Sequence, residues 1–461
     1  MCGIFGVRGA PDAASLVHLG LYSLQHRGQE SAGIVAVDES GAAHAARTLG
    51  LVSEGFGAAE LAPLSGHVAI GHTRYSTSGS STIENAQPVL ARYRGGHISL
   101  AHNGNITNAT ELRRELEADG AIFGSTMDSE VLVHRLARSR ADRLEDKMAD
   151  ALQGVEGAFC VLVLIDDVLL AARDSRGWRP LALGRMPDGA PVVASETCAL
   201  DIVGAAYERD VEPGEILRID GDGIHSSRFG ERMDSRRCVF EYVYFARPDS
   251  RIFGGSVDRA RRSLGRRLAL EAPAPGADLV FSVPDSSNSA ALGYAEVSGL
   301  SYELALIRNH YIGRTFIQPT QGGRNAKVKI KYNAVREVLE GMSVVMVDDS
   351  IVRGTTTRGL VAMIRAAGAR EVHIRVSSPP VTGPCYYGID TPNREELIAA
   401  HEDTEGIARI IGVDSLAYLS LDGMLGAVPD GPGGFCHACF SGDYPTPPPT
   451  DPDKLRFGCG C

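Results

Sequence analysis

Residues 344–357 read Val-Val-Met-Val-Asp-Asp-Ser-Ile-Val-Arg-Gly-Thr-Thr-Thr, and this stretch decides the fold of the second half of the chain. An apolar run typical of a buried strand ends in two adjacent acids, and a loop rich in hydroxyl groups follows. Apolar residues at one-face spacing over 360–367 predict the next helix, and Gly368 suits its carboxyl end. Residues 372–376 again have the pattern of a strand. This order predicts a parallel βαβ unit of an open, doubly wound sheet.

The first half of the chain alternates strand-like runs with helical stretches. We expect strands at six apolar runs, the last two joined as a hairpin: residues 3–7, 34–37, 68–71, 98–101, 158–165 and 168–172. A helix is expected over residues 13–25, with Leu16, Leu19 and Leu24 on one side. This half is therefore predicted to consist of stacked sheet and helix layers.

A polar, charged stretch at residues 226–237 separates the two patterns. The chain of 461 residues is long for one ordinary core, so we predict two domains, at residues 2–230 and 231–461. The tail from residue 429 to 452 is rich in proline and glycine. Such a segment cannot build its own core, so the body of the protein must hold it if it is ordered.

Composition narrows the classes of function. The chain is 44% hydrophobic and 22% charged, with a formal net charge of -11, which argues against nucleic acid as a partner. It contains no run of eighteen apolar residues, and its first residues do not resemble a secretory signal, so we expect no membrane span and a cytoplasmic location. Nine cysteines are too few for a disulfide-rich scaffold, so a cysteine cluster would be catalytic or metal-binding.

The loop after residue 347 has the chemistry of an anion site. Backbone N–H groups of a glycine-containing loop and a helix N-terminus attract anions, and Gly354 allows close approach. Asp348 and Asp349 face the same ligand and can bind a ribose diol. The loop matches neither the Walker A pattern nor the dinucleotide-binding glycine pattern. The alternative is an ordinary acidic strand end before a capped helix.

Cys2 directly follows Met1. Removal of Met1 would give this cysteine a free α-amine with an ordinary pKa of about 7.7–8.0, able to act as general base for its own thiol. Such a residue can attack a carboxamide, form a thioester and release ammonia. Alone, a cysteine at this position is more simply a coincidence.

Polar segments at four places favour a site for glutamine, which is a zwitterion with an amide: residues 25–33, 71–77, 101–105 and 125–130. Arg74 would hold the α-carboxylate, Asp128 the α-ammonium group, and Asn103 with Gly104 the tetrahedral oxyanion. Each alone could equally be a cap, a turn or a surface ion pair.

With these residues, residues 2 to about 225 resemble the class II glutamine amidotransferase domain. The resemblance implies an N-terminal-nucleophile fold, an αββα sandwich, with Cys2 as nucleophile. It assigns Arg74 and Asp128 to glutamine, and Asn103 and Gly104 to the oxyanion.

Residues 344–357 resemble the phosphoribosyl diphosphate motif of type I phosphoribosyltransferases, which implies a doubly wound parallel sheet. The resemblance assigns the ribose hydroxyls to Asp348 and Asp349, and the 5-phosphate to the loop at residues 350–357. The loop residues predicted to bind are Ser350, Ile351, Val352, Arg353, Gly354, Thr355 and Thr356. Magnesium would bridge the diphosphate at Asp348 and Asp349, with Ser286 at a matching position.

A basic stretch lies upstream of this motif: Arg324, Lys327, Lys329, Lys331 and Arg336. It could be a solvated charged edge. Its position in the phosphoribosyltransferase pattern favours a flap that closes over the diphosphate, with Lys331 as a ligand residue.

Both halves together resemble the amidophosphoribosyltransferase family over nearly the whole chain. Matching segments include residues 241–250, 313–319 and 436–442. The resemblance implies that ammonia from glutamine passes through an internal channel to C1 of 5-phosphoribosyl 1-diphosphate. It also implies purine nucleotides as feedback inhibitors and a homotetramer.

Four cysteines of the second half are candidates for a metal site: Cys238, Cys385, Cys436 and Cys439. Spacing alone leaves zinc, an iron–sulfur cluster and a redox pair open. A subset of the family carries a [4Fe–4S] cluster at matching places, and the resemblance therefore implies such a cluster here.

Two other functions compete with this reading. A different class II amidotransferase is disfavoured by the Asp348–Asp349 loop. A non-catalytic phosphoribosyl diphosphate sensor would need neither Cys2 nor the groups around it.

Overall fold

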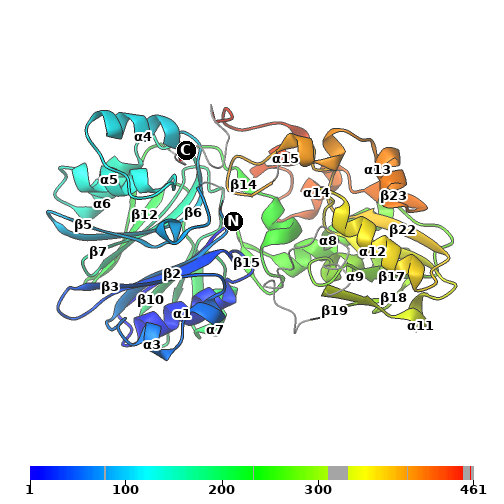
Figure 1. Ribbon diagram of the computed structural model, residues 1–461, viewed down its shortest axis with the longest axis horizontal. Helices are drawn as coiled ribbons and strands as arrows, with labels where there is room; N and C mark the ends of the chain where they lie inside the picture. Colours follow the sequence, from blue (N-terminus) through cyan, green and yellow to red (C-terminus); the bar gives the residue numbers. More distant parts are fainter. Residues whose placement is uncertain (77–78, 232, 310–330, 392, 450–456, 458–461) are drawn as a thin grey trace.

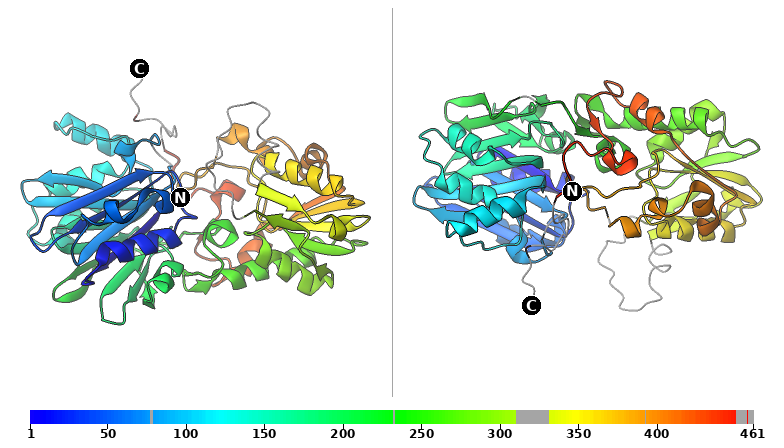
Figure 2. Two further views of the ribbon diagram at one scale, coloured as in Figure 1. Left: turned by 60° about the horizontal axis from the view of Figure 1, so that its bottom comes forward. Right: turned by 90° about the horizontal axis from the view of Figure 1, so that it is seen from above.

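The computed structural model describes residues 1–76, 79–231, 233–309, 331–391, 393–449 and 457. The chain forms two bodies side by side, and its amino terminus lies between them (Figure 1). Figure 2 shows this arrangement from two further directions, with the red carboxyl-terminal segments along the junction. The first residues of the chain are therefore close to both halves.

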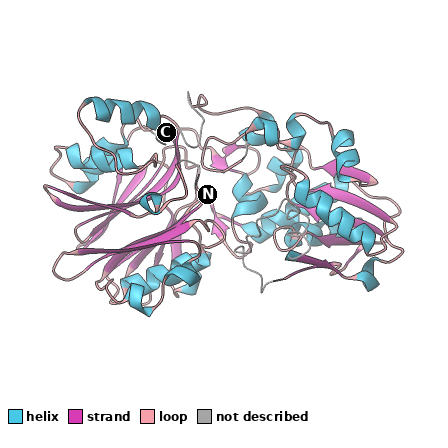
Figure 3. Cartoon of the chain, in the orientation of Figure 1, coloured by secondary structure: helices cyan, strands magenta, loops and turns pink. Residues whose placement is uncertain are grey.

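The first body contains two antiparallel sheets (Figure 3). One has seven strands, in the order β11 (Ala206–Asp210), β9 (Ala182–Arg185), β10 (Pro191–Ala194), β1 (Gly3–Arg8), β4 (Val68–Arg74), β2 (Ser31–Val37) and β3 (Ala43–Leu49). The other has six, in the order β13 (Gly223–Arg228), β12 (Glu215–Asp220), β8 (Val168–Arg173), β7 (Gly157–Ile165), β6 (Gly96–Ile106) and β5 (Val89–Tyr93).

Apolar side chains such as Ile4, Val35 and Leu162 fill the space between these sheets. The outer face of the first sheet is covered by α1 (Ala13–Ser23), α2 (Val52–Gly55), α3 (Ala58–Leu61) and α7 (Cys198–Ile202). That of the second is covered by α4 (Ala109–Ala118), α5 (Glu130–Arg138) and α6 (Leu144–Leu152). A short 3-10 turn, η1 (Ile83–Asn85), precedes β5. These layers confirm the predicted αββα sandwich.

Helix α1 differs from its prediction in which face is buried. Leu19 is 42% exposed, while Val17, Leu21 and Leu24 are fully buried against the sheet. Leu16 and Leu24 lie toward the core as expected, but Leu19 lies on the solvent side. The glycine at position 20 packs directly over the Phe5 ring, so the buried stripe runs through small residues that a search for large apolar side chains passes over.

The second body is a parallel five-stranded sheet, confirming the predicted doubly wound fold. Its strand order is β18 (Ser301–Tyr302), β17 (Leu279–Ser282), β21 (Ser343–Asp348), β22 (Glu371–Val376) and β23 (Ser415–Tyr418). One face is covered by α8 (Val257–Glu271), α9 (Asn288–Ser298) and α14 (Leu421–Ala427). The other is covered by α12 (Thr355–Ala366) and α13 (Thr404–Ile411).

Both faces of β21 are buried: Val345 and Val347 pack toward α8 and α9, and Val344 and Met346 toward α12. This explains the continuous apolar run of the sequence. Gly368, with φ +100°, follows the last turn of α12, as its predicted place at the carboxyl end requires.

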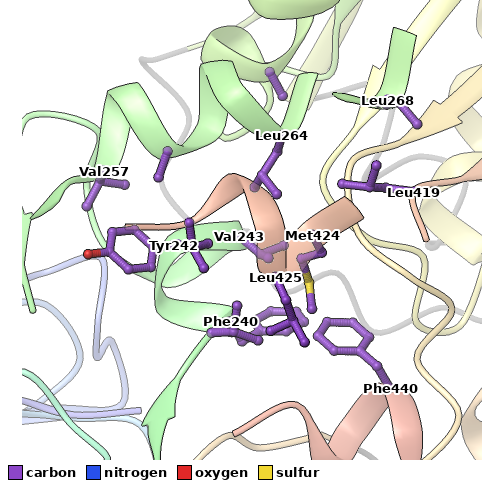
Figure 4. Close-up of a cluster of buried hydrophobic side chains, with 14 of the residues drawn as sticks. Phe240, Tyr242, Val243, Val257, Leu264, Leu268, Leu419, Met424, Leu425 and Phe440 are labelled. Carbon is purple, nitrogen blue, oxygen red and sulfur yellow. The ribbon is translucent and has the colours of Figure 1, made fainter. Parts of the chain in front are cut away.

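Shorter elements connect the two bodies and the outer edge of the second. They are β14 (Arg237–Cys238), the π-helix η2 (Glu241–Phe245), β15 (Arg251–Ile252), β16 (Gly255–Ser256), β19 (Leu306–Arg308), β20 (Tyr332–Ala334), α11 (Arg336–Leu339), η3 (Arg394–Glu396), η4 (Ile398–Ala400), β24 (Phe435–Cys436) and α15 (Ala438–Ser441). The tail is held as expected, because β24 pairs with β14 in parallel. Figure 4 shows Phe440 of the tail in one apolar cluster with Phe240 and with Tyr242 and Val243 of η2.

Candidate active sites

Cys2 lies immediately before β1, at the end of the sheet where β4 also ends. Its side chain is buried, and its Sγ lies 3.6 Å from the carbonyl oxygen of Tyr75. Its backbone N–H donates to Asn103 Oδ1 at 3.3 Å, which links it to β6 of the other sheet. Met1 is also buried, at 1% exposure, and packs in the apolar cluster of the second body.

Asn103 and Gly104 lie side by side in β6, opposite Cys2. The Nδ2 of Asn103 is buried and has no hydrogen-bond partner among the residues that the structure describes. Gly104 has φ +149°, and a Cβ there would lie 1.9 Å from the carbonyl oxygen of Ala158. Only glycine fits this position. An oxyanion site requires an unpaired N–H donor close to the nucleophile, and Asn103 Nδ2 lies in the residue that accepts from the Cys2 N–H.

Arg74 and Asp128 complete the predicted glutamine site. Arg74 ends β4, is buried, and donates from Nη1 to the carbonyl oxygen of Ser80 at 2.9 Å. Burial lowers the pKa of Arg74, while the nearby Cys2 thiol and the Asp128 carboxylate oppose this shift. Asp128 Oδ2 accepts from the backbone N–H of Ile106 at 2.8 Å. The structure thus brings the predicted residues together from β4, β6, the residue before β1 and the loop before α5.

A buried ion network next to Cys2 was not assigned from the sequence. Arg27 Nε donates to the carbonyl oxygen of Cys2 at 2.9 Å, and its Nη1 lies 2.5 Å from Glu196 Oε1. The Arg27 guanidinium also donates to both carboxylate oxygens of Glu241, at 2.8 and 3.0 Å. Arg179 Nη1 lies 3.3 Å from Glu241 Oε1 and donates to the sulfur of Met1. All four charged side chains are fully buried.

Two members of this network, Arg27 and Glu241, lie in segments singled out from the sequence, residues 25–33 and 241–250. Their pairing carries no local sequence signal, because Arg27 and Glu241 are 214 positions apart. Each positive charge in the network meets a carboxylate, which is the condition under which buried charges are tolerated.

In the second body, Asp348 and Asp349 lie at the carboxyl end of β21, as predicted. Both are buried, at 8% and 6% exposure. Ser287 Oγ lies 3.5 Å from Asp348 Oδ1 and 3.4 Å from Asp349 Oδ2. Ser286, the predicted magnesium residue, lies in the same turn and hydrogen-bonds the Asp349 carboxylate. The turn after β17 and the end of β21 thus form one oxygen-rich site.

Burial raises the pKa of both carboxyl groups, and the charge of Asp349 raises that of Asp348 further. Within the described ranges, neither carboxylate forms an ion pair with Lys or Arg. When both carboxyl groups are ionised, the site therefore carries negative charge that no ion pair within the described residues neutralises, and a bound cation would neutralise it. Serine and carboxylate oxygens are the ligands that Mg²⁺ prefers.

The loop after the acids leads into α12 with its backbone toward the strand ends. Ile351 is buried in the core, and Arg353 Nε pairs outward with Glu396 Oε2 at 2.7 Å. Gly354, at φ +71°, caps the helix, and Thr355 and Thr356 are exposed at its first turn. This loop offers an anion its backbone N–H groups and hydroxyls, not the side chains of Ile351 or Arg353.

The predicted flap falls mostly outside the described residues, which resume at position 331. Arg324 and Lys327 lie in the part not described, as does Lys329. Lys331 is exposed next to β20, with its Nζ 4.9 Å from the ring centroid of Tyr332. The Tyr332 hydroxyl donates to the carbonyl oxygen of Pro284, so this strand is attached to the turn that carries Ser286.

The four predicted cluster cysteines line one small cavity, together with Trp178, Arg179, Tyr387, Ile389, Ala438 and Tyr444. Cys238 and Cys436 are register partners in the β14–β24 pair. Burial raises the pKa of Cys238 to about 11, and that of Cys436 and Cys439 further. In the described part of the chain no three His, Cys, Asp or Glu side chains are grouped closely enough to hold a metal ion. The same residues contain no helix long and apolar enough to cross a membrane.

Comparison with known proteins agrees with this geometry. Residues 72–201 match a glutamine amidotransferase domain. The chain is 51% identical to the amidophosphoribosyltransferase of Bacillus subtilis (strain 168), over 96% of this chain and 94% of that protein. It is 50% identical to the amidophosphoribosyltransferase of Rhizobium etli, over 96% and 92% of the two chains. The chain belongs to the amidophosphoribosyltransferase family.

Solved structures extend the likeness to the fold. The chain superposes with a TM-score of 0.93, at 49% identity, on a structure described as the allosteric regulatory enzyme of purine biosynthesis, covering 99% of both chains. It superposes with a TM-score of 0.91, at 50% identity, on the Bacillus subtilis enzyme complexed with ADP and GMP, covering 97% of this chain and 98% of that one.

The family membership gives the reaction that this chain catalyses. It hydrolyses glutamine and transfers the nitrogen to C1 of 5-phosphoribosyl 1-diphosphate, which yields 5-phosphoribosylamine, glutamate and diphosphate. This is the first committed step of purine nucleotide synthesis. This pentosyltransferase reaction excludes the two alternative functions, a non-catalytic phosphoribosyl diphosphate sensor and a different class II amidotransferase.

Proposed function

We propose that the reaction is divided between two sites, with glutamine cleaved at Cys2 and the sugar held at the Asp348–Asp349 loop. In this proposal Cys2 forms a glutamyl thioester once Met1 is removed. Asn103 Nδ2 and the Gly104 N–H stabilise the oxyanion, and Arg74 and Asp128 bind the two charged ends of glutamine. The observation that carries the proposal is the unpaired, buried Nδ2 of Asn103, in an amide whose Oδ1 accepts from the backbone N–H of Cys2.

The environment of the amino terminus supports a neutral amine as base. In the chain with Met1, burial and the guanidinium groups of Arg179 and Arg27 lower the pKa of the terminal amine to about 5. A Cys2 amine in this region would lie near the same guanidinium groups. Its free-base form would therefore be favoured at neutral pH.

Cys2→Ala tests this assignment. We expect glutamine-dependent synthesis to be lost while synthesis from added ammonia is retained, because only nitrogen release needs the thiol. Cys198→Ala is the matched control, since Cys198 is another buried free cysteine. Loss of ammonia-dependent synthesis in a folded Cys2→Ala protein would contradict separate sites.

At the second site we propose that Mg²⁺ is held by Asp348 and Asp349, with Ser286 nearby, and neutralises the diphosphate as it leaves. The chain's own residues bind and orient the sugar: the loop 350–356 holds the 5-phosphate, and Lys331 contacts the diphosphate. The negative charge of the buried Asp348–Asp349 pair, which no ion pair neutralises in the described residues, supports this assignment. Ammonia would reach C1 through the interior between the two bodies. This route would keep it away from bulk water, which would protonate it.

We propose further that the four cysteines hold a [4Fe–4S] cluster that fixes the tail to the body. Four soft sulfur donors line one cavity, which supports such a cluster, although the described side chains would have to move closer together to hold it. The raised thiol pKa values mean that binding must displace protons. Iron and acid-labile sulfide in anaerobically purified protein test it. Zinc alone, or a metal-free protein of full activity and stability, would contradict it.

Regulation and assembly are proposed from the relatives. The Bacillus subtilis structure contains ADP and GMP, which supports purine nucleotides as feedback inhibitors of this chain. We also propose a homotetramer and a cytoplasmic location. Initial rates with each nucleotide test the first, and analytical ultracentrifugation the second.

A further inference from the structure

A run of buried and half-buried hydrogen bonds joins the two sites through η2. At its start, the Arg27 guanidinium binds the Cys2 carbonyl oxygen and both oxygens of Glu241. Glu241 is the first residue of η2 and is completely buried. The backbone next to the proposed nucleophile is thus attached to the second body through one carboxylate.

Arg261 of α8 holds the other side of η2. Its Nε donates to the carbonyl oxygen of Tyr242 and its Nη2 to that of Ala246, both at 2.8 Å. Its Nη1 donates to the carbonyl oxygen of Ser286 at 3.4 Å. One side chain thus connects both ends of η2 to the turn of the proposed magnesium site.

The charge of Arg261 is poised to respond to that site. It is 2% exposed, and within the described residues it contacts only carbonyl oxygens and no carboxylate. Burial lowers the pKa of Arg261, and among the nearby charges Asp349 opposes this shift most strongly. A cation and a diphosphate held at Asp349 would change the electric field at Arg261, which hydrogen-bonds the Ser286 carbonyl oxygen in the same site and two carbonyl oxygens of η2 and its end.

The form of η2 suits such a connection. π-Helices are rare and occur mostly as single turns at functional sites. Tyr242 and Val243 anchor η2 in the apolar cluster of Figure 4. We infer that Glu241 and Arg261 are positioning residues that couple ammonia release at Cys2 to occupation of the Asp348–Asp349 loop. The inference rests on the two proposed sites.

The experiment compares Glu241→Gln and Arg261→Lys with two matched controls. Arg262→Lys changes the neighbouring residue of α8, which pairs with Asp258 on the surface. Glu215→Gln removes another buried carboxylate that faces an arginine, Arg209, away from η2. Thermal melting and ammonia-dependent synthesis are measured first, and we expect both test variants to be folded and to retain that synthesis.

The decisive readouts are the glutaminase rate with and without 5-phosphoribosyl 1-diphosphate, and the ratio of glutamate released to phosphoribosylamine formed. In the parent and the controls we expect the sugar to raise the glutaminase rate and the ratio to stay near one. In both test variants we expect the stimulation to fall by roughly fivefold or more, with excess glutamate released. The double variant should be no worse than either single one, because both act through η2.

Unchanged stimulation and ratio in folded Glu241→Gln and Arg261→Lys would overturn the inference. An equal loss with ammonia and glutamine would also overturn it, because it would show a structural effect on the sugar site. A Cys2→Ala protein that still uses glutamine would instead refute the proposed nucleophile, so the two failures are distinguishable.

Discussion

The candidate glutamine site draws its groups from separate segments between residues 2 and 128, whereas the candidate phosphoribosyl site takes most of its groups from residues 348–356. At the first, each side chain is fixed by contacts with distant strands, as Cys2 is by Asn103. At the second, a strand end, a loop and a helix start supply acids, backbone N–H groups and hydroxyls in order. A single substitution at the dispersed site should therefore remove one function of that site. A single substitution at the contiguous site should weaken substrate binding and catalysis together.

The largest effect is expected at the contiguous site. Asp349→Asn should lower synthesis from glutamine and from ammonia alike by on the order of 10³-fold, because in the proposed sugar site it would remove a carboxylate that holds Mg²⁺ against the departing diphosphate. Initial rates with both nitrogen donors measure this. Basal glutaminase activity without sugar should persist. A variant that loses only glutamine-dependent synthesis would reverse the roles of the two sites.

At the dispersed site, Asn103→Ala should reduce glutamine-dependent synthesis by about 10²- to 10³-fold, the usual cost of one oxyanion donor. The Nδ2 group is unpaired in the described structure, but Oδ1 accepts from the buried N–H of Cys2, so the substitution should cost about 1 kcal/mol of stability. The fall should appear in kcat for glutamine, with ammonia-dependent synthesis unchanged. Thermal melting is the control, and a changed KM alone would point to a binding role instead.

Gly354→Ala should have an intermediate effect. The residue has φ +71°, and an added Cβ would lie 3.0 Å from Ile398 Cδ1. We expect a loss of about 1 kcal/mol of stability and a higher KM for the sugar, because the loop must adjust. Gly412→Ala, at φ +85° with no atom within 4 Å of the added Cβ, is the matched control for backbone conformation alone. Equal KM values in the two variants would contradict a role for the Gly354 loop in binding.

The smallest effect is expected at Arg353, although it lies within the sugar loop. Its guanidinium pairs with Glu396 on the surface, with about half of each side chain exposed. Arg353→Ala should change stability by less than about 1 kcal/mol and the sugar KM by less than about threefold. Denaturant unfolding and steady-state kinetics check this. A large KM increase would mean that the side chain leaves Glu396 to bind phosphate.

The same contrast explains what could be predicted from the sequence. The βαβ unit and its acids are local, so Asp348, Asp349 and Gly354 were found at their true places in the fold. Cys2, Arg74, Asn103 and Asp128 lie in separate segments, and they could be predicted to share a site only through the family resemblance. The Arg27–Glu241 pair could not be found, because no periodicity links residues of different bodies. The buried face of α1 was missed at Leu19 because Gly20 packs on Phe5.

The burial of Met1 has a consequence for how the protein matures. An exopeptidase acts on an extended, accessible chain end, yet the Met1 side chain is enclosed by residues that join the structure only after position 238 has been synthesised. If Cys2 is the nucleophile, as proposed, cleavage has to happen early, while the nascent chain is still leaving the ribosome. A polypeptide that folded before processing would then seal its own starting residue inside and be unable to use glutamine.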